Sequence, residues 1–105
     1  MDYENFQDYD ISQGTSEREQ LKEPPKYKVI FFNDDYTTME FVVYVLQKVF
    51  HKAEDEAQKI MFKVHKSGSA IVGVYSYDIA KTRSEMTVSL ARSQGYPLRC
   101  QIQAE

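Results

Sequence analysis

Apolar and polar residues alternate in two parts of the chain, and this alternation predicts β-strands. In the first, Tyr27, Val29 and Phe31 fall on one side of the pattern and Lys28 on the other. In the second, residues 98, 100 and 102 are apolar, whereas residues 99, 101 and 103 are polar. A further strand is expected over residues 69–75.

Between the strands, apolar residues recur about every three to four positions, which is the spacing of helices. This spacing predicts helices over about residues 38–50, 53–66 and 76–93. Gly68 is expected to end the second helix, and Ile79, Met86 and Leu90 are expected to be the inward residues of the third. The order β-α-α-β-α-β predicts an α+β fold, a single small domain with three helices covering a three-stranded, mainly antiparallel sheet.

Residues 1–25 differ from the rest of the chain. They show no lasting helical or strand period, and they contain seven acidic residues against two basic ones, a net charge of −5, whereas the remainder carries +2. Pro24 and Pro25 close the segment. We therefore expect a flexible acidic N-terminal extension over residues 1–25 and a folded core over residues 26–105.

The composition limits the classes of function. No apolar run approaches the roughly 18 residues of a membrane span, and no clustered basic face for nucleic acid is evident. Cys100 is the single cysteine, so it allows no internal disulfide and indicates a reducing compartment. We expect a cytoplasmic protein. The four glycines form no phosphate-binding pattern, and no cofactor is expected.

The polar sequence Asn33-Asp34-Asp35 separates the first strand from the first helix. Thr37 and Glu40 have the spacing of a capping box, which predicts that the Thr37 hydroxyl caps the helix and that Glu40 reaches back. The loop would then hold hydrogen-bond acceptors suited to a positively charged donor. An Asx turn that only ends the strand and starts the helix explains the same residues equally well.

His65 is expected near the end of the second helix, on the same face as Met61. A lone helical histidine is more often structural. If this helix end lies beside the loop at 33–35, however, an imidazole, an amide and carboxylates converge next to a hollow lined by Met39 and Met61. The two methionines could equally be core residues. Cys100 is expected to pack in its strand, and no catalytic residue is predicted.

Several segments together closely resemble the ClpS family, the bacterial adaptors that carry N-degron substrates to the ClpA unfoldase of the ClpAP protease. The resemblance covers about residues 24–104. The matching segments are Asn33-Asp34-Asp35-Tyr36-Thr37-Thr38-Met39-Glu40-Phe41-Val42, Met61-Phe62-Lys63-Val64-His65, Gly68, Gly73-Val74-Tyr75 and Pro97-Leu98.

This resemblance implies a peptide-binding pocket and no catalytic centre, cofactor or metal. ClpS proteins recognise substrates that begin with Leu, Phe, Tyr or Trp. Asn33, Asp35 and His65 would hold the free α-amino group, with Asp34 helping on the nearby peptide backbone. The residues implied to line the pocket for the first side chain are Thr37, Met39, Val42, Met61, Val64 and Leu98.

The resemblance also implies a second contact surface. Asp78 and Arg83 occupy positions where the family has an acid and a base that meet the N-terminal domain of the unfoldase. Both keep the charge but alter the reach of the side chain. Thr38 stands where relatives often have proline. The implied partners are the ClpA N-terminal domain and N-degron peptides, and the adaptor is expected to be a monomer that binds neither nucleic acid nor membranes.

Two other functions remain open from the residues alone. One is a small α+β protein-docking module with no N-terminus specificity. The other is a hydrolase in which Asp34, Asp35 and His65 hold a divalent metal ion, because mixed oxygen and nitrogen ligands suit such an ion.

Overall fold

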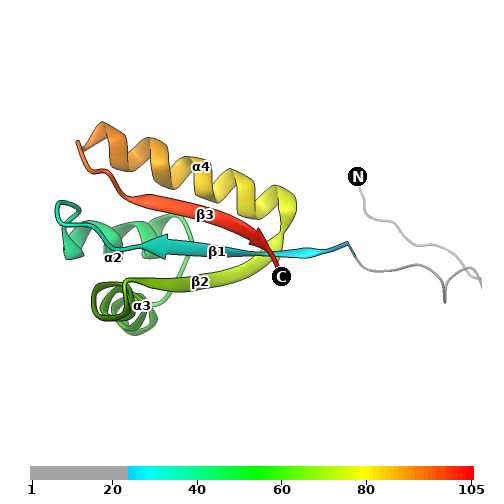
Figure 1. Cartoon of the computed structure of the whole chain (residues 1–105), viewed down its shortest axis with the longest axis horizontal. Helices are drawn as coiled ribbons and strands as arrows, with labels where there is room; N and C mark the ends of the chain where they lie inside the picture. Colours follow the sequence, from blue (N-terminus) through cyan, green and yellow to red (C-terminus); the bar gives the residue numbers. More distant parts are fainter. Residues whose placement is uncertain (1–23) are drawn as a thin grey trace, which may run out of the picture.

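The computed structural model describes residues 24–105, and its helices and strands follow the predicted order (Figure 1). The α+β class and the β-α-α-β-α-β order are confirmed. Most of the predicted extension over residues 1–25 lies outside the described residues. The elements are β1 (Lys26–Phe32), α2 (Met39–Lys48), α3 (Glu54–Ser67), β2 (Ser69–Ser76), α4 (Tyr77–Ser93) and β3 (Arg99–Ala104).

The three strands form one sheet in the order β2-β1-β3, and both neighbouring pairs are antiparallel. Because β1 is the central strand, its inward side chains have a neighbouring strand on each side, and Val29 and Phe31 are fully buried. The other face is open, and Ile71 and Val74 of β2 are exposed there. A bulge between Val29 and Ile30 shifts the pairing of β1 with β2.

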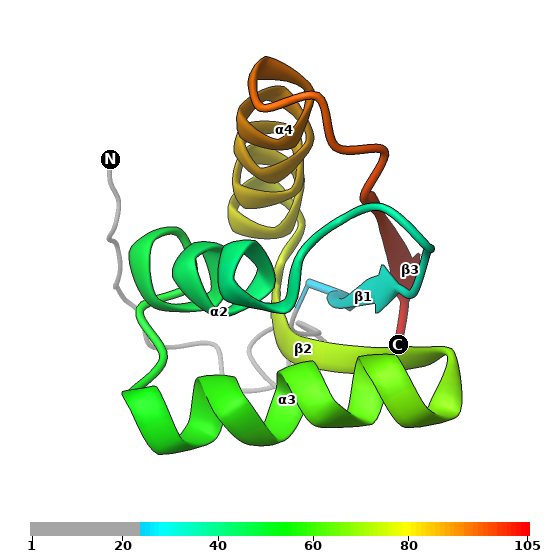
Figure 2. The same cartoon turned by 90° about the vertical axis from the view of Figure 1, so that its left-hand side faces the viewer.

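The helices cover the buried face of the sheet (Figure 2). In this view α2 lies beside β1, with α3 beneath it next to β2 and α4 above it. Leu46 of α2 and Leu98, just before β3, belong to the same buried core as Phe31, and all three are at most 1% exposed. The short connection after β1 runs from the central strand of the sheet to the start of α2, and the end of α3 lies next to this connection.

The inward face of α4 was predicted correctly for Leu90, which packs against the core, but wrongly for the other two residues. Ile79 and Met86 are 44% and 51% exposed, and the buried positions are instead Ala80, Thr87 and Ala91. These small side chains let the helix backbone approach the sheet closely. The Thr87 hydroxyl can be buried because it donates a hydrogen bond of 2.8 Å to the Arg83 carbonyl. Two large apolar side chains consequently remain on the outside of α4.

The end of α3 was predicted correctly. Gly68 adopts a left-handed conformation with φ of 91°, and its N–H bonds the Val64 carbonyl. This turn leads straight into β2, whose first residue pairs with Phe32 at the end of β1. The end of α3 and the end of β1 are thereby held together. No helix of the described segment, residues 24–105, is long and apolar enough to cross a membrane.

Candidate functional site: a cavity between the loop after β1 and the end of α3

The start of α2 differs from the predicted capping box. The N-cap is Thr38, whose Oγ1 accepts a hydrogen bond of 3.1 Å from the Phe41 N–H. Thr37 is not the cap, and its hydroxyl instead donates to Asp34 Oδ2 at 2.8 Å. The helix therefore begins one residue later than the capping box requires.

Asp34 forms the Asx turn that was the alternative interpretation of this loop. Its Oδ1 accepts hydrogen bonds from the backbone N–H groups of Tyr36, at 2.8 Å, and Thr37, at 2.7 Å. Partial burial acts to raise the pKa of Asp34, but these bonds, the Thr37 hydroxyl and the positive charge of Arg92 outweigh it and lower the pKa. Asp34 is thus an ionised brace that fixes the loop.

The loop is also tied to the end of α3. The Asn33 N–H donates to the Gly68 carbonyl at 2.9 Å. Because His65 lies less than one helical turn before Gly68, this bond places the imidazole beside the loop. In the described part of the chain, the side chains of Asn33 and Asp35 make no hydrogen bond. Both are exposed, and both remain available to a ligand.

A cavity of about 530 Å³ lies between this loop, the start of α2 and the end of α3. It brings together Asn33, Asp34, Asp35 and His65, which the family resemblance implied for binding the α-amine and the nearby peptide backbone. It also contains five of the six residues implied for the side-chain pocket, namely Thr37, Met39, Val42, Met61 and Val64. Leu98 is not among its lining residues; it lies in the core, 1% exposed, and its role in the pocket stays a prediction.

Three further lining residues were not predicted as site residues: Tyr36, Thr38 and Glu40. Their position in the chain was the available signal, since all three lie within the same loop and first helical turn as the predicted residues. Glu40 is the most consequential of them because it adds a third carboxylate to the rim.

The cavity has two chemically different parts. Val42, Met61 and Val64 are buried and give it an apolar floor. Met39 is 42% exposed and lines the same cavity, so its flexible thioether stands at the mouth. The rim carries carboxylate, amide and imidazole groups, and it contains no lysine or arginine. Such a site suits a ligand with a cationic group next to an apolar group.

The geometry gives no support to the metal hypothesis. Within residues 24–105, no three His, Cys, Asp or Glu side chains are grouped so that they could hold a metal ion. The carboxylate oxygens of Asp34 are already engaged with the loop.

The second predicted surface is a separate hollow of about 350 Å³ between the end of α2 and the start of α4. Both Asp78 and Arg83 line it, together with the exposed Ile79 and Met86. The Arg83 guanidinium lies 5.3 Å from the centre of the Tyr75 ring. A Cβ at Gly73 would come within 2.5 Å of the Tyr75 hydroxyl. Glycine at position 73 therefore leaves room for the ring against which Arg83 is held.

Comparison with known proteins agrees with this geometry. The family model of the ATP-dependent Clp protease adaptor protein ClpS matches residues 22–101. The chain belongs to the ClpS family. The predicted resemblance is confirmed, and so is the prediction of an adaptor of the Clp protease rather than an enzyme.

Individual ClpS proteins match over most of their length. The adaptor of Leptospira biflexa is 46% identical over 103 residues, which are 96% of this chain and 91% of the relative. That of Nautilia profundicola is 57% identical over 76 residues, 72% of this chain and 78% of the relative. Among solved structures, Agrobacterium tumefaciens ClpS2 bound to L-phenylalaninamide is 41% identical with a TM-score of 0.76, covering 79% of this chain and all of that one.

Proposed function

We propose that this ClpS-family adaptor binds the free N-terminus of proteins that begin with Leu, Phe, Tyr or Trp and delivers them to the ClpA unfoldase of ClpAP. It would act as a monomer in the cytoplasm. The observation that carries the proposal is the single cavity in which amine-accepting groups and an apolar floor lie side by side.

The rim has the chemistry of an α-amine site. An α-amino group has an ordinary pKa of about 7.7 to 8.0, so it is mostly a cation at neutral pH and presents three N–H donors. The Asp35 carboxylate, the Asn33 amide oxygen and a ring nitrogen of His65 offer three acceptors on the rim of the cavity. Each hydrogen bond to such a charged group is worth roughly 1.5 to 3 kcal/mol.

The floor has the chemistry of a pocket for the first side chain. Burial of about 150 to 250 Å² of an aromatic ring at about 25 cal/mol per Å² yields on the order of 4 to 6 kcal/mol before association costs. Neither the rim nor the floor alone would give useful affinity, and together we expect them to give micromolar or tighter binding. A side chain branched at Cβ would crowd Met39 at the mouth.

The similarity to A. tumefaciens ClpS2 supports this ligand class. L-phenylalaninamide has a free α-amine, an aromatic side chain and an uncharged amide in place of the carboxylate. It thus stands in for the first residue of a peptide that begins with Phe, which is the combination of cation and apolar group that suits the cavity of this chain.

Delivery would use the hollow at the start of α4. An acid and a base lie there beside two exposed apolar side chains, a mixture that suits a protein partner better than a small ligand. We assign this surface to the N-terminal domain of ClpA. The acidic extension over residues 1–25 would engage the same unfoldase, so a chain lacking residues 1–20 should bind peptides but fail to deliver them.

Fluorescence anisotropy tests the binding step directly. A labelled peptide that begins with Phe should bind at micromolar concentration or better, and its N-acetylated twin should not, because acetylation removes the cation and two donors. A peptide that begins with Gly tests the floor separately. Equal binding of the free and acetylated peptides would refute the proposal and favour a docking module without N-terminus specificity.

A further inference from the structure

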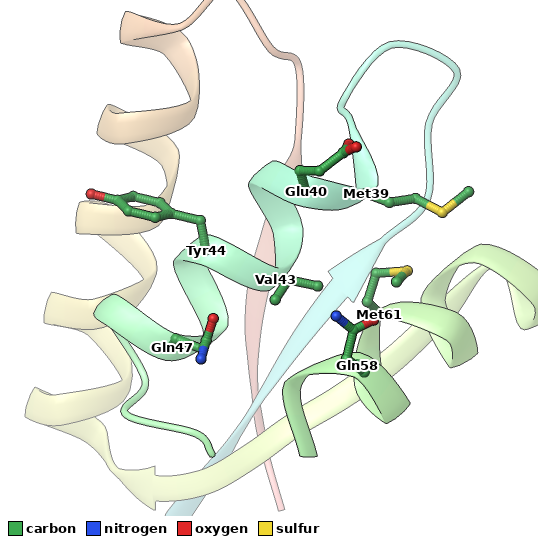
Figure 3. Close-up of a pocket in the computed structure, with 7 residues that line it drawn as sticks. All are labelled: Met39, Glu40, Val43, Tyr44, Gln47, Gln58 and Met61. Atoms are coloured by element: carbon green, nitrogen blue, oxygen red, sulfur yellow. The ribbon is translucent and has the colours of Figure 1, made fainter. Parts of the chain in front are cut away.

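A second hollow adjoins the cavity. It has a volume of about 400 Å³, lies between α2 and α3, and shares Met39, Glu40 and Met61 with the first. Its other lining residues are Val43, Tyr44, Gln47 and Gln58. Figure 3 shows Val43 of α2 on the side that faces Gln58 and Met61 of α3. The two hollows are therefore successive parts of one groove, divided by the two methionines.

The direction of the groove follows from the two helices. On α3, the lining residues pass from His65 through Met61, which both hollows share, to Gln58. On α2 they pass from Met39 to Val43 and Gln47. At 1.5 Å per residue, Val43 lies about 6 Å beyond Met39 along the helix axis. The second hollow is thus displaced by roughly this distance from the first, on the side away from the amine-binding rim.

This displacement matches the repeat of an extended peptide. Side chains alternate between the two sides of an extended chain, so the first and third residues point the same way, about 6.6 Å apart. With the first side chain in the cavity and the chain leaving along the groove, the third side chain reaches the second hollow. The second side chain points to solvent.

The lining of the second hollow favours one class of side chain. Met39, Val43 and Met61 provide apolar surface for a long aliphatic stem. Glu40 at its rim is a carboxylate, the side-chain carbonyls of Gln47 and Gln58 are further acceptors, and no lysine or arginine contributes to the lining. We propose that this hollow is a subsite for the third residue of the substrate, with preference for lysine or arginine. The proposal rests on the N-terminus-binding function above.

The test uses the full chain and labelled peptides that begin with Phe and differ only at position three. Lysine at this position should bind about threefold to tenfold tighter than glycine, as expected for one partly exposed ionic contact plus stem burial. Lysine moved to position two should give no such gain.

Gln58→Trp places a large ring in the second hollow at a residue that does not line the first. Lys59→Trp, at the next and exposed position of α3, is its matched control. Gln58→Trp should reduce the preference for lysine to less than twofold while affinity for the glycine peptide is retained, which also shows that the variant is folded. Gln47→Lys should reverse the preference towards glutamate. Lys59→Trp should change neither.

Each contrary outcome has a distinct meaning. If the wild-type chain binds the Phe peptide, but not its acetylated twin, with equal affinity whatever its third residue, the subsite is refuted and the N-terminus site stands. If the lysine preference survives in Gln58→Trp, the cation is attracted elsewhere and the subsite is again refuted. If acetylation has no effect, the N-terminus site itself fails, and the subsite with it.

Discussion

The proposed peptide-binding cavity at the start of α2 and the hollow between the end of α2 and the start of α4 differ in how their side chains are held. At the N-terminal end, the loop is fixed by three hydrogen bonds to Asp34 and by a backbone bond to Gly68. At the C-terminal end, Asp78, Ile79 and Met86 are exposed on one side of α4. A rigid concave site suits a small, repeated group such as a chain start, whereas an open surface suits a large partner that brings its own shape.

Peptide binding in the cavity and partner binding at α4 should also be independent of each other, because the two sites lie far apart. Met39 and Lys48, the first and last residues of α2, are separated by about 14 Å along the helix axis. Substitutions that share no partner and lie more than about 7 to 10 Å apart usually act additively. Changes in the cavity should therefore alter peptide binding, and changes on α4 should alter only the contact with the unfoldase.

The largest effect is expected from Asp35→Ala. Removing the free carboxylate on the rim should weaken binding of every peptide with a free N-terminus about 10- to 100-fold, because a hydrogen bond to a charged group is lost. Anisotropy titrations with peptides beginning with Phe and Leu measure this loss. Binding to the isolated ClpA N-terminal domain should be unchanged. A reduction confined to one of the two peptides would contradict an amine-binding role for Asp35.

Met39→Ala should change selectivity more than overall affinity. Shortening the side chain at the mouth should admit residues branched at Cβ, so the preference for a Phe start over an Ile or Val start should fall by about tenfold. A panel of four peptides with different first residues measures the ratio. Uniform weakening across the panel would show instead that Met39 contributes only apolar contact.

Asp34→Ala should lower stability where Asp35→Ala does not. Three hydrogen bonds to an ionised group are lost, and we expect a decrease of about 1 kcal/mol in the free energy of unfolding at neutral pH. The pKa of Asp34 is lowered in the folded state, so its contribution is present above the ordinary carboxyl range and is lost as the pH falls through the lowered pKa. Urea unfolding at pH 7 and at successively lower pH should show the gap closing. Equal stability of the two variants would contradict the role of Asp34 in stabilising the loop.

Most of the cavity could be predicted because the motif that carries the family resemblance is one continuous segment. Residues 33–42 contribute ten contiguous positions, of which all but Phe41 line the cavity. What the sequence could not decide was which threonine caps α2. In the structure the Thr37 hydroxyl donates to Asp34 and the Thr38 hydroxyl caps the helix, a difference that spacing alone does not reveal.

The face of α4 could not be predicted in the same way. A pattern of apolar residues indicates which side of a helix is hydrophobic, but close packing of a helix on a sheet favours small residues. In α4, Ala80 and Ala91 are buried in place of Ile79 and Met86. The hollow between α2 and α3 could not be predicted from the sequence either, since it depends on the distance between two helices. Contacts within a segment were therefore easier to predict than contacts between segments.

The smallest effects are expected on α4. Asp78→Ala and Arg83→Ala should each weaken binding to the ClpA N-terminal domain by at most about fivefold, because ionic contacts at an exposed surface contribute roughly 0.2 to 1 kcal/mol. Raising the ionic strength should shrink both effects. Lys81→Ala is the matched control, since Lys81 pairs with Glu85 on the same helix and does not line the hollow.

Arg83→Lys separates charge from position on this surface. It keeps the cation but loses the planar group that lies over Tyr75. If the ring orients the guanidinium for its partner, Arg83→Lys should weaken the unfoldase contact nearly as much as Arg83→Ala. If charge alone matters, it should bind like the wild-type chain. Peptide affinity should remain unchanged in all of these variants, and a parallel loss of peptide binding would show that the two ends of α2 are coupled.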